Sequence, residues 1–346
     1  MIKALILAGG KGAHLRPLAL QTPKPVVPLA NIPFLFFQID RIKRAGITEI
    51  ILSLSYQPRK IMDIFGDGTR YGVIIRYTHE ELPRGTAGAF KAAENLIEDT
   101  TVVLNGDVLT DTDLQDVIRC HREKQAEATI VMVRVLNPTG YGLVEADASG
   151  RVVRFTEKPA EDEVTGDTIN GGIYVLERSV LDHIPAEGSQ SFEREVFPAM
   201  LQGGLGVYSY LARGYWQDIG SPQKYLEAHF GIISGRMKLP AYPRKACAPI
   251  EWDRDQVSID QVSILDGGCV IKPGVIIENS VLGEDCRVEE GALIRDSVIW
   301  SGTRIRPHAR IERSILGRQC HVGEGARLRS GTVLGDKSIV TDYSVV

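Results

Sequence analysis

A glycine-rich segment near the start of the chain carries two basic residues at spacings suited to binding phosphate. Gly9, Gly10 and Gly12 follow an apolar run, and Arg16 and Lys24 come next. Glycines let backbone N–H groups approach phosphate oxygens, because no Cβ intervenes. The arginine can donate to two oxygens, and the lysine ammonium supplies a point charge. The pattern predicts an anion-binding loop, with an ordinary βα turn as the alternative.

Lys24 stands between Pro23 and Pro25, which we expect to keep its backbone extended. No regular periodicity returns until about Phe34, and connections of this length in a compact domain are usually functional or disordered. The glycines match neither G-x-x-x-x-G-K-[ST] nor a G-x-G-x-x-G that opens directly into a helix. The sequence therefore excludes a P-loop NTPase and a standard dinucleotide-binding protein.

Two aspartates are candidates for binding a metal ion. Asp107 ends the predicted strand at 101–107, and Asp218 lies where another predicted strand runs into a turn. A hard cation such as Mg²⁺ that bridges phosphates takes one or two carboxylates together with substrate oxygens. Each residue alone could equally be a turn aspartate.

The segment Leu7-Ala-Gly-Gly-Lys-Gly-Ala-His-Leu-Arg-Pro-Leu18, followed by Pro23-Lys-Pro25, resembles the signature of the sugar-nucleotide pyrophosphorylases. These enzymes are nucleotidyltransferases that act on sugar 1-phosphates, and the resemblance extends over the whole chain. One departure is Ala13 and His14, which stand where the family usually has a Thr-Arg pair. The family arginine contacts the triphosphate, so this change bears on phosphate affinity or rate.

The resemblance implies a nucleotide site, a sugar-phosphate site and a metal site. The nucleotide would be bound by Leu7, Ala8, Gly9, Gly10, Gly12, Arg16, Lys24, Glu80, Gly85, Thr86 and Asp107. The sugar phosphate would be bound by Tyr141, Gly142, Glu157, Lys158, Asn170, Gly171 and Trp216. Mg²⁺ would be held by Asp107 and Asp218, and these two residues with Arg16 and Lys24 would be the catalytic ones.

Glu80 bears on the choice of base. Thymidylyl and uridylyl relatives commonly have a glutamine here, and a carboxylate can only accept hydrogen bonds. Guanine offers two adjacent donors, and a bidentate pair is worth roughly 1–3 kcal/mol of discrimination. The segment Pro83-Arg-Gly-Thr-Ala-Gly88 also resembles that of mannose-1-phosphate guanylyltransferases. We therefore favour GTP, while Glu80 or Glu81 as a solvated loop acid remains the alternative.

Residues 1–235 alternate strand and helix patterns, which predicts an α/β domain with a Rossmann-like mixed sheet and ligands at the carboxyl ends of its strands. Strands are predicted at 4–8, 48–55, 73–78, 101–107, 128–135, 141–145, 152–158 and 168–176. Helices are predicted at 33–45, 58–65, from Gly88 to about Leu96, at 192–201 and at 221–235. The amphipathic segment 192–201 is expected to face the core.

A repeat with a 17-residue period follows a proline-rich linker at 236–256. Ser263, Ser280, Ser297 and Ser314 mark the period, each followed by two aliphatic residues. Three hexapeptide-like steps with one residue deleted make one coil of a left-handed β-helix, so 257–346 should stack about five coils around an apolar column.

Cysteines and histidines within the repeat each have an alternative interpretation. Cys269, Cys286 and Cys320 share the period, with Thr303 at the position between Cys286 and Cys320, which predicts an inward ladder of small residues and neither a disulfide nor a metal site. Some hexapeptide solenoids are acyltransferases that need a histidine base, for which His308 and His321 are the candidates. We favour two turn histidines, and expect the solenoid to mediate homo-oligomerisation or effector binding.

The composition narrows the class of protein. A net charge of −4 argues against nucleic-acid and membrane-surface partners, and no apolar run could span a bilayer. The chain enters a predicted strand without a signal-peptide pattern, so we expect a cytoplasmic protein. The five cysteines include no C-x-x-C pair, which disfavours zinc.

The predicted activity is nucleotidyl transfer from a nucleoside triphosphate to a sugar 1-phosphate, with GTP and mannose 1-phosphate favoured, Mg²⁺ as cofactor and pyrophosphate as the second product. Ala13 and His14 motivate the alternative of a non-catalytic regulatory paralogue that binds a nucleotide-sugar. The same chemistry with dTTP or UTP and glucose 1-phosphate, or with a heptose or cyclitol phosphate, also remains open.

Overall fold

The computed structural model describes residues 2–160, 162, 164–244, 246–253 and 255–346, which form two compact units. The first, here called the sheet unit, comprises residues 1–11 and 38–216. The second, the solenoid unit, comprises residues 12–37 and 217–346. Segments 12–37 and 217–235, which the sequence assigns to the N-terminal domain, thus form one compact unit with the repeats.

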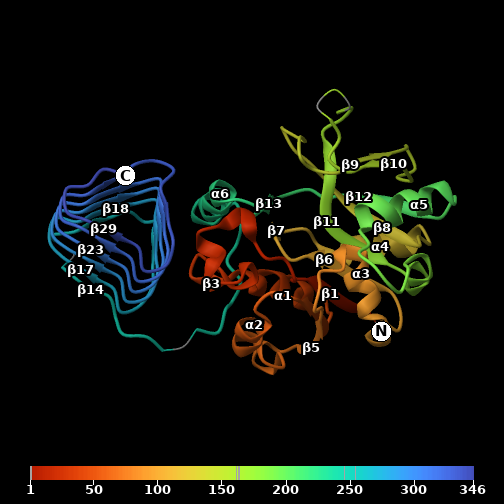
Figure 1. Cartoon of the computed structure of the whole chain (residues 1–346), viewed down its shortest axis with the longest axis horizontal. Coiled ribbons are helices and arrows are strands. Elements are labelled where there is room, and N and C mark those ends of the chain that lie inside the picture. The colour runs from red at the N-terminus through yellow and green to blue at the C-terminus, as the bar shows by residue number, and fades with distance from the viewer. Residues whose placement is uncertain (1, 161, 163, 245, 254) are drawn as a thin grey trace. The chain divides into compact units, whose positions relative to one another are not determined.

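The described residues of the sheet unit form a nine-stranded mixed sheet (Figure 1). Its strands are β1 (Lys3–Leu7), β4 (Glu49–Leu54), β5 (Ile74–His79), β6 (Thr101–Asn105), β8 (Ala128–Arg134), β9 (Leu143–Ala146), β10 (Val152–Thr156), β11 (Thr168–Leu176) and β12 (Val207–Leu211). Strands β5, β4, β1 and β6 are parallel neighbours in that order, and β11 pairs antiparallel with β6. The predicted Rossmann-like mixed sheet is confirmed.

Helices form at or near four of the five predicted segments, and the helix at Leu114–Glu123 was not predicted. The helices are α1 (Phe34–Arg44), α2 (Pro58–Phe65), α3 (Gly85–Ala92), α4 (Leu114–Glu123), α5 (Phe197–Gln202) and α6 (Pro222–Ile233). The single helix predicted at 192–201 is instead a π-helical turn at Phe192–Val196 followed by α5. Pro198 has no N–H to donate to the preceding turn, which prevents a continuous α-helical ladder there.

No helix in the part of the chain that the structure describes is long and apolar enough to cross a membrane.

The solenoid consists, in its described residues, of three parallel sheets, drawn in cyan to blue in Figure 1. The first sheet contains β14 (Glu251–Trp252), β17 (Val270–Ile271), β20 (Arg287–Val288), β23 (Arg304–Ile305), β26 (His321–Val322) and β29 (Ile339–Val340). The second contains β15 (Ser258–Ile259), β18 (Ile276–Glu278), β21 (Leu293–Arg295), β24 (Arg310–Glu312) and β27 (Arg327–Leu328). The third contains β16 (Ile264–Leu265), β19 (Val281–Leu282), β22 (Val298–Ile299), β25 (Ile315–Leu316) and β28 (Val333–Leu334).

The 17-residue register pairs each coil with the next, as the sequence predicts. Val281 lies beside Val298 and Val298 beside Ile315, whereas the step from Ile315 to Val333 contains one extra residue. Strand β14 lies inside the segment predicted as a linker, so pairing begins earlier than the serine repeat indicates.

Two polar ladders run along the solenoid. Cys269, Cys286, Thr303 and Cys320 are buried, and each donates a hydrogen bond to a backbone carbonyl one coil further on, Gly283, Trp300, Gly317 and Gly335 respectively. The burial of these residues confirms the predicted inward ladder. The three cysteines are free thiols.

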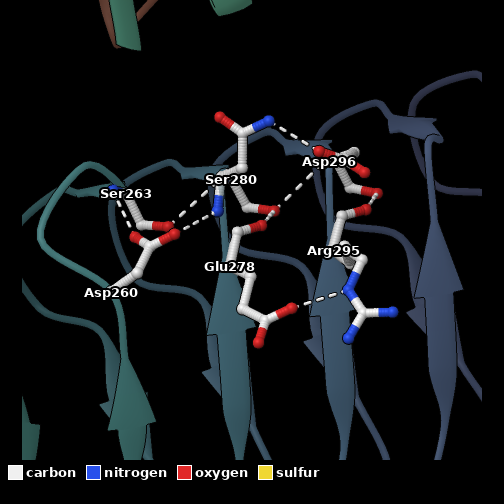
Figure 2. A network of polar contacts seen from close by, with 8 residues as sticks. Asp260, Ser263, Glu278, Ser280, Arg295 and Asp296 are labelled. Carbon is white, nitrogen blue, oxygen red and sulfur yellow. Dashed lines mark hydrogen bonds and ion pairs between the residues drawn. The ribbon is translucent and has the colours of Figure 1, made fainter. Parts of the chain in front are cut away.

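The serine ladder satisfies backbone N–H groups at a turn (Figure 2). The Ser280 Oγ accepts from the Ser297 N–H at 3.0 Å and donates to the Glu278 carbonyl at 2.6 Å. Ser263 and Ser297 accept in the same way from the next serine N–H along the chain. On the surface beside the ladder Arg295 pairs with Glu278 at 2.6 Å. The repeated serine therefore replaces a backbone acceptor that the turn lacks.

Candidate functional site

The carboxyl ends of β1 and β6 bring the first predicted nucleotide residues together. Leu7 is the register partner of Asn105, and the Gly106 N–H donates to the Leu7 carbonyl at 3.0 Å. A Cβ on Gly106 would lie 2.4 Å from that carbonyl oxygen, so only glycine fits. The chain places β4 and β5 on one side of β1 and then returns to place β6 on the other side. Open α/β sheets bind ligands at such a switch point, here between β1 and β6.

Residues that leave this edge are those the sequence singles out. Ala8, Gly9 and Gly10 continue from β1, and Asp107 lies two residues beyond β6, half-buried. The Ser55 hydroxyl donates to the Gly9 carbonyl and fixes the start of the loop. Around Gly10 a Cβ would meet no atom within 4 Å, so its backbone faces open space.

Three further predicted phosphate residues belong to the solenoid unit. Gly12 has a left-handed φ of 62°, and a Cβ there would lie 3.0 Å from the Lys24 Cβ, so these two residues are neighbours. Lys24 opens a 3₁₀ turn at Lys24–Val26, and the expectation that its prolines keep it extended is wrong. The Val26 N–H donates to the Pro23 carbonyl, a closure that Pro25 permits because its missing N–H is not used. Arg16 is exposed.

Asp218 is also in the solenoid unit and is already engaged. Its Oδ1 accepts from the Gly220 N–H at 2.9 Å, and its Oδ2 pairs with Lys224 at 2.7 Å. The side chain keeps 14% of its surface exposed. Among the described residues there is no group of three or more His, Cys, Asp and Glu side chains that could hold a metal ion.

The predicted sugar-phosphate residues gather within the sheet unit. The Asn170 N–H donates to the Gly142 carbonyl at 2.8 Å, and a Cβ on Gly142 would lie 2.7 Å from the Glu157 Oε2. The Trp216 indole N–H donates to the Gly171 carbonyl at 2.9 Å. Its ring meets the Tyr141 ring edge-on, with centroids 5.6 Å apart. Lys158, after β10, is exposed and has a left-handed φ of 48°.

Sequence reasoning assigned no role to Glu193, yet its carboxylate joins the two predicted substrate sites. The Glu193 Oε2 accepts from the Thr86 hydroxyl at 2.6 Å, and the Oε1 accepts from the Tyr174 hydroxyl at 2.8 Å. The Asn170 amide donates to the same Tyr174 oxygen at 2.7 Å. Only 8% of Glu193 is exposed. Its sequence context, an amphipathic segment, gives no sign of this network.

Burial and the nearby Glu193 charge act on a second carboxylate. The pKa of Glu157 is raised above its ordinary value, first because the group is removed from water and then because Glu193 repels its charge. Both effects disfavour the charged form of Glu157, and a cation bound beside it would act in the opposite direction.

Glu80 is not a solvated loop acid. It is 6% exposed, its Oε1 accepts from the Ser53 hydroxyl at 2.5 Å, and its Oε2 accepts from the Arg84 N–H at 2.9 Å. Both carboxylate oxygens of Glu80 are therefore hydrogen-bonded, one of them to the backbone of the segment that leads into α3. At the helix start Gly85 has φ 74°, and a Cβ there would lie 2.4 Å from the Gln190 carbonyl oxygen.

Comparison with known families accounts for this arrangement. A family model described as nucleotidyl transferase matches residues 3–234. The chain belongs to the nucleotidyl transferase family. A second model, described as the EIF2B subunit epsilon LbH domain, matches residues 252–346.

Curated relatives match over most of their length. The mannose-1-phosphate guanylyltransferase of Mycobacterium tuberculosis is 40% identical over 85% of this chain and 83% of its own. Mannose-1-phosphate guanylyltransferase 1 of Arabidopsis thaliana is 36% identical over 88% and 82%. The UTP–glucose-1-phosphate uridylyltransferase of Synechocystis is 33% identical over 88% and 84%.

A solved structure supports the fold. A putative glucose-1-phosphate thymidylyltransferase from Bacillus anthracis superposes with a TM-score of 0.61 at 23% identity, covering 66% of this chain and 94% of that one. The predicted enzyme class, nucleotidyltransferase with a C-terminal left-handed β-helix, is confirmed.

Proposed function

We propose that this nucleotidyltransferase transfers the guanylyl group of GTP to mannose 1-phosphate, forming GDP-mannose and pyrophosphate. The observation that carries the proposal is the match, at 36–40% identity over most of the chain, to enzymes named mannose-1-phosphate guanylyltransferases. The uridylyltransferase at 33% identity makes UTP with glucose 1-phosphate the second candidate.

In the proposed reaction a phosphate oxygen of the sugar 1-phosphate attacks the α-phosphorus of GTP. The new P–O bond forms as the bond to the β-phosphate bridging oxygen breaks, and that oxygen leaves with pyrophosphate. Gly10, Gly12 and Arg16 would bind the triphosphate, and Lys24 would hold the reacting phosphates in line. Lys158 would bind the phosphate of the sugar.

A divalent metal is implied by the family, and the oxygen donors present suit Mg²⁺. Asp107 and Asp218 would hold it, each a half-buried carboxylate. When bound, the ion supplies charge neutralisation to the phosphates. The Lys224 ammonium, 2.7 Å from the Asp218 Oδ2, orients this carboxylate.

For the base, we propose that Glu80 accepts hydrogen bonds from guanine. The carboxylate has about four acceptor sites, and two serve Ser53 and Arg84, so about two are left for the base. Its rigid attachment would fix the direction of those acceptors. Asn170, Gly142 and Glu157 would contact sugar hydroxyls, since Gly142 lies against both of the other two residues.

The test is pyrophosphate release with Mg²⁺, crossing GTP, dTTP, UTP, CTP and ATP with mannose 1-phosphate and glucose 1-phosphate. Release with GTP and mannose 1-phosphate alone supports the proposal. Release with UTP or dTTP and glucose 1-phosphate would overturn the substrate assignment and leave the family intact. Glu80→Gln is the matched variant. If Glu80 binds guanine, this variant should lose its preference for GTP, and an unchanged preference would remove Glu80 from base recognition.

We also propose a homo-oligomer formed through the β-helix. Its last coil exposes Ile339, Tyr343, Val345 and Val346, each at 50% or more. Light scattering of the wild type and of Ile339→Lys tests this: a smaller particle for the variant supports it, and a monomeric wild type contradicts it.

A further inference from the structure

One corner of the solenoid lies along the segment that carries Arg16 and Lys24. The corner comprises the last residue of each strand of the β16–β19–β22–β25–β28 sheet and the turn that follows it. Residues of this corner are Leu282, Trp300, Arg318 and Gly335, one from each of four successive coils. Both segments belong to the solenoid unit.

Each coil is linked to the segment from Pro17 to Asn31, three of them directly and the Trp300 coil through Tyr225 of α6. The Asn31 amide donates to the Leu282 carbonyl at 2.8 Å. The Trp300 indole donates to the Tyr225 hydroxyl at 3.0 Å, and that hydroxyl donates to the Pro28 carbonyl.

The next two coils continue the series. The Arg318 guanidinium donates to the hydroxyl of Thr22, and a Cβ on Gly335 would lie 3.2 Å from the Pro17 Cβ. Arg318 is itself held 4.8 Å from the Trp300 ring centroid.

The order of these contacts is regular. As the coils advance from 282 to 335, the contacted residues go back from 31 through 28 and 22 to 17. The segment therefore runs antiparallel to the direction in which the solenoid grows. Stacked coils are about 4.8 Å apart, so three steps span about 14 Å, far less than the extended reach of the segment. Its compact path is set by short 3₁₀ turns and by these four contacts, here called the anchors.

The outer face of this sheet differs from those of its neighbours. Val281, Val298 and Ile315 point outward from their strands and are nevertheless at most 2% exposed. The equivalent outward residues Arg287 and Arg304 of the first sheet are exposed. Burial of three aliphatic residues makes this face a permanent packing surface.

We propose that the solenoid positions the phosphate-binding segment, with Trp300 and Arg318 as positioning residues for nucleotidyl transfer. Arg16 directly precedes the Pro17 contact, and Lys24 lies between the Thr22 and Pro28 contacts, so both cations are within four residues of an anchor. Nucleotidyl transfer depends on placing phosphates and cations accurately, and small displacements reduce rate strongly. The inference rests on the proposed role of Arg16 and Lys24 as phosphate ligands.

The test compares Arg318→Ala with Arg304→Ala in the full-length protein. Arg304 is a matched control, since it is an arginine of the same solenoid, paired with Glu289 at 2.8 Å on another sheet. Asn31→Gly is a second variant that removes the amide donor and tolerates the left-handed φ of 64° at this position. It keeps the test decisive if Arg318→Ala does not fold.

Two readouts are needed. In Arg318→Ala and Asn31→Gly, backbone hydrogen exchange should rise in residues 17–31 and not in the solenoid strands. The KM for the active nucleoside triphosphate should rise about tenfold, which corresponds to about 1.4 kcal/mol, with the KM for the sugar phosphate unchanged. Exchange and KM values equal to those of Arg304→Ala would overturn the proposal.

The readouts separate this inference from the proposed function. If Arg16→Ala keeps full turnover, the phosphate role of the segment fails, and hydrogen exchange still decides whether the solenoid holds it. If exchange is unchanged while Arg16→Ala is inactive, the proposed function stands and the positioning role is rejected.

Discussion

Replacing Glu193 by glutamine is the sharpest test of the buried network in the sheet unit. The Glu193 carboxylate accepts hydroxyl hydrogens from Thr86, Ser191 and Tyr174 at 2.6, 2.6 and 2.8 Å. Glutamine has nearly the same volume but offers one oxygen and an NH₂ group. The glutamine NH₂ group then faces a hydroxyl group that donated to the Glu193 carboxylate, and this hydroxyl has no acceptor left on that side.

The expected loss follows from that mismatch. Thr86 already accepts from the Phe192 N–H, and Tyr174 already accepts from Asn170. Either hydroxyl could accept a second bond from the glutamine NH₂, but its own O–H would then lose the acceptor that Glu193 provides. A hydrogen bond to a buried charged group is worth about 1.5–3 kcal/mol. We expect Glu193→Gln to lower the free energy of unfolding by about 2–3 kcal/mol, one such bond.

Urea unfolding followed by circular dichroism measures the loss, with Glu195→Gln as the control. Glu195 lies on the same turn, is exposed, and accepts only from the Ser191 N–H at 2.7 Å among the bonds described for it. Glutamine serves equally well in that capping position, so the control should change stability by less than about 0.5 kcal/mol. Equal stability of the two variants would refute the reasoning, because it would mean that the buried carboxylate is not needed as a three-bond acceptor.

Four further outcomes are expected. Arg16→Ala should lower turnover by about 10²–10³, the effect of removing one preorganised charge donor, and turnover within a few-fold of wild type would remove that role. Asp107→Asn should abolish Mg²⁺-dependent turnover, and an unchanged Mg²⁺ titration would contradict the metal assignment. In Glu193→Gln the pKa of Glu157 should fall, since one repelling charge is gone, so its step in the pH profile of the sugar-phosphate KM should move to lower pH. Burial lowers the pKa of His229 from 6.5 to about 4, so the folded state holds the neutral form. Up to about 3 kcal/mol of stability is therefore present above pH 6.5 and is lost as the pH falls from 6.5 to 4. In urea unfolding at pH 7 and pH 4.5, His229→Phe should show a smaller loss of stability than the wild type.

Much of the fold follows from local sequence pattern. Strands β1, β4 and β6 lie within or close to runs of aliphatic residues without alternation, and buried parallel strands have that composition. The 17-residue repeat fixes the solenoid register, because each serine hydroxyl must meet the N–H of the next serine and each cysteine thiol must meet a backbone carbonyl of the next coil. The glycine-rich turn and Asp107 could be placed at one edge because parallel strands share the direction of their carboxyl ends.

What the sequence could not show depends on contacts between distant segments. Glu193 lies 107 residues from Thr86, and an amphipathic pattern gives no reason to expect a buried carboxylate there. The Thr22 hydroxyl meets Arg318 across 296 residues, and nothing in either segment indicates the partner. Lys24 was misjudged for a local reason: prolines on both sides favour extended backbone, but a 3₁₀ turn can also use a proline in its first positions.

The two polar ladders limit how such a solenoid can change its length during evolution. Duplicating 17 residues would give every new Ser N–H and Cys S–H a partner of the same kind, whereas another length would interrupt the serine ladder. Consistent with this, the serine ladder stops at Ser314, where the interval between strands changes to 18 residues. Growth is thus favoured in whole coils. A coil inserted between Leu282 and Gly335 would also displace the anchors of the segment 17–31 by about 4.8 Å, so we expect lengthening to occur beyond those coils.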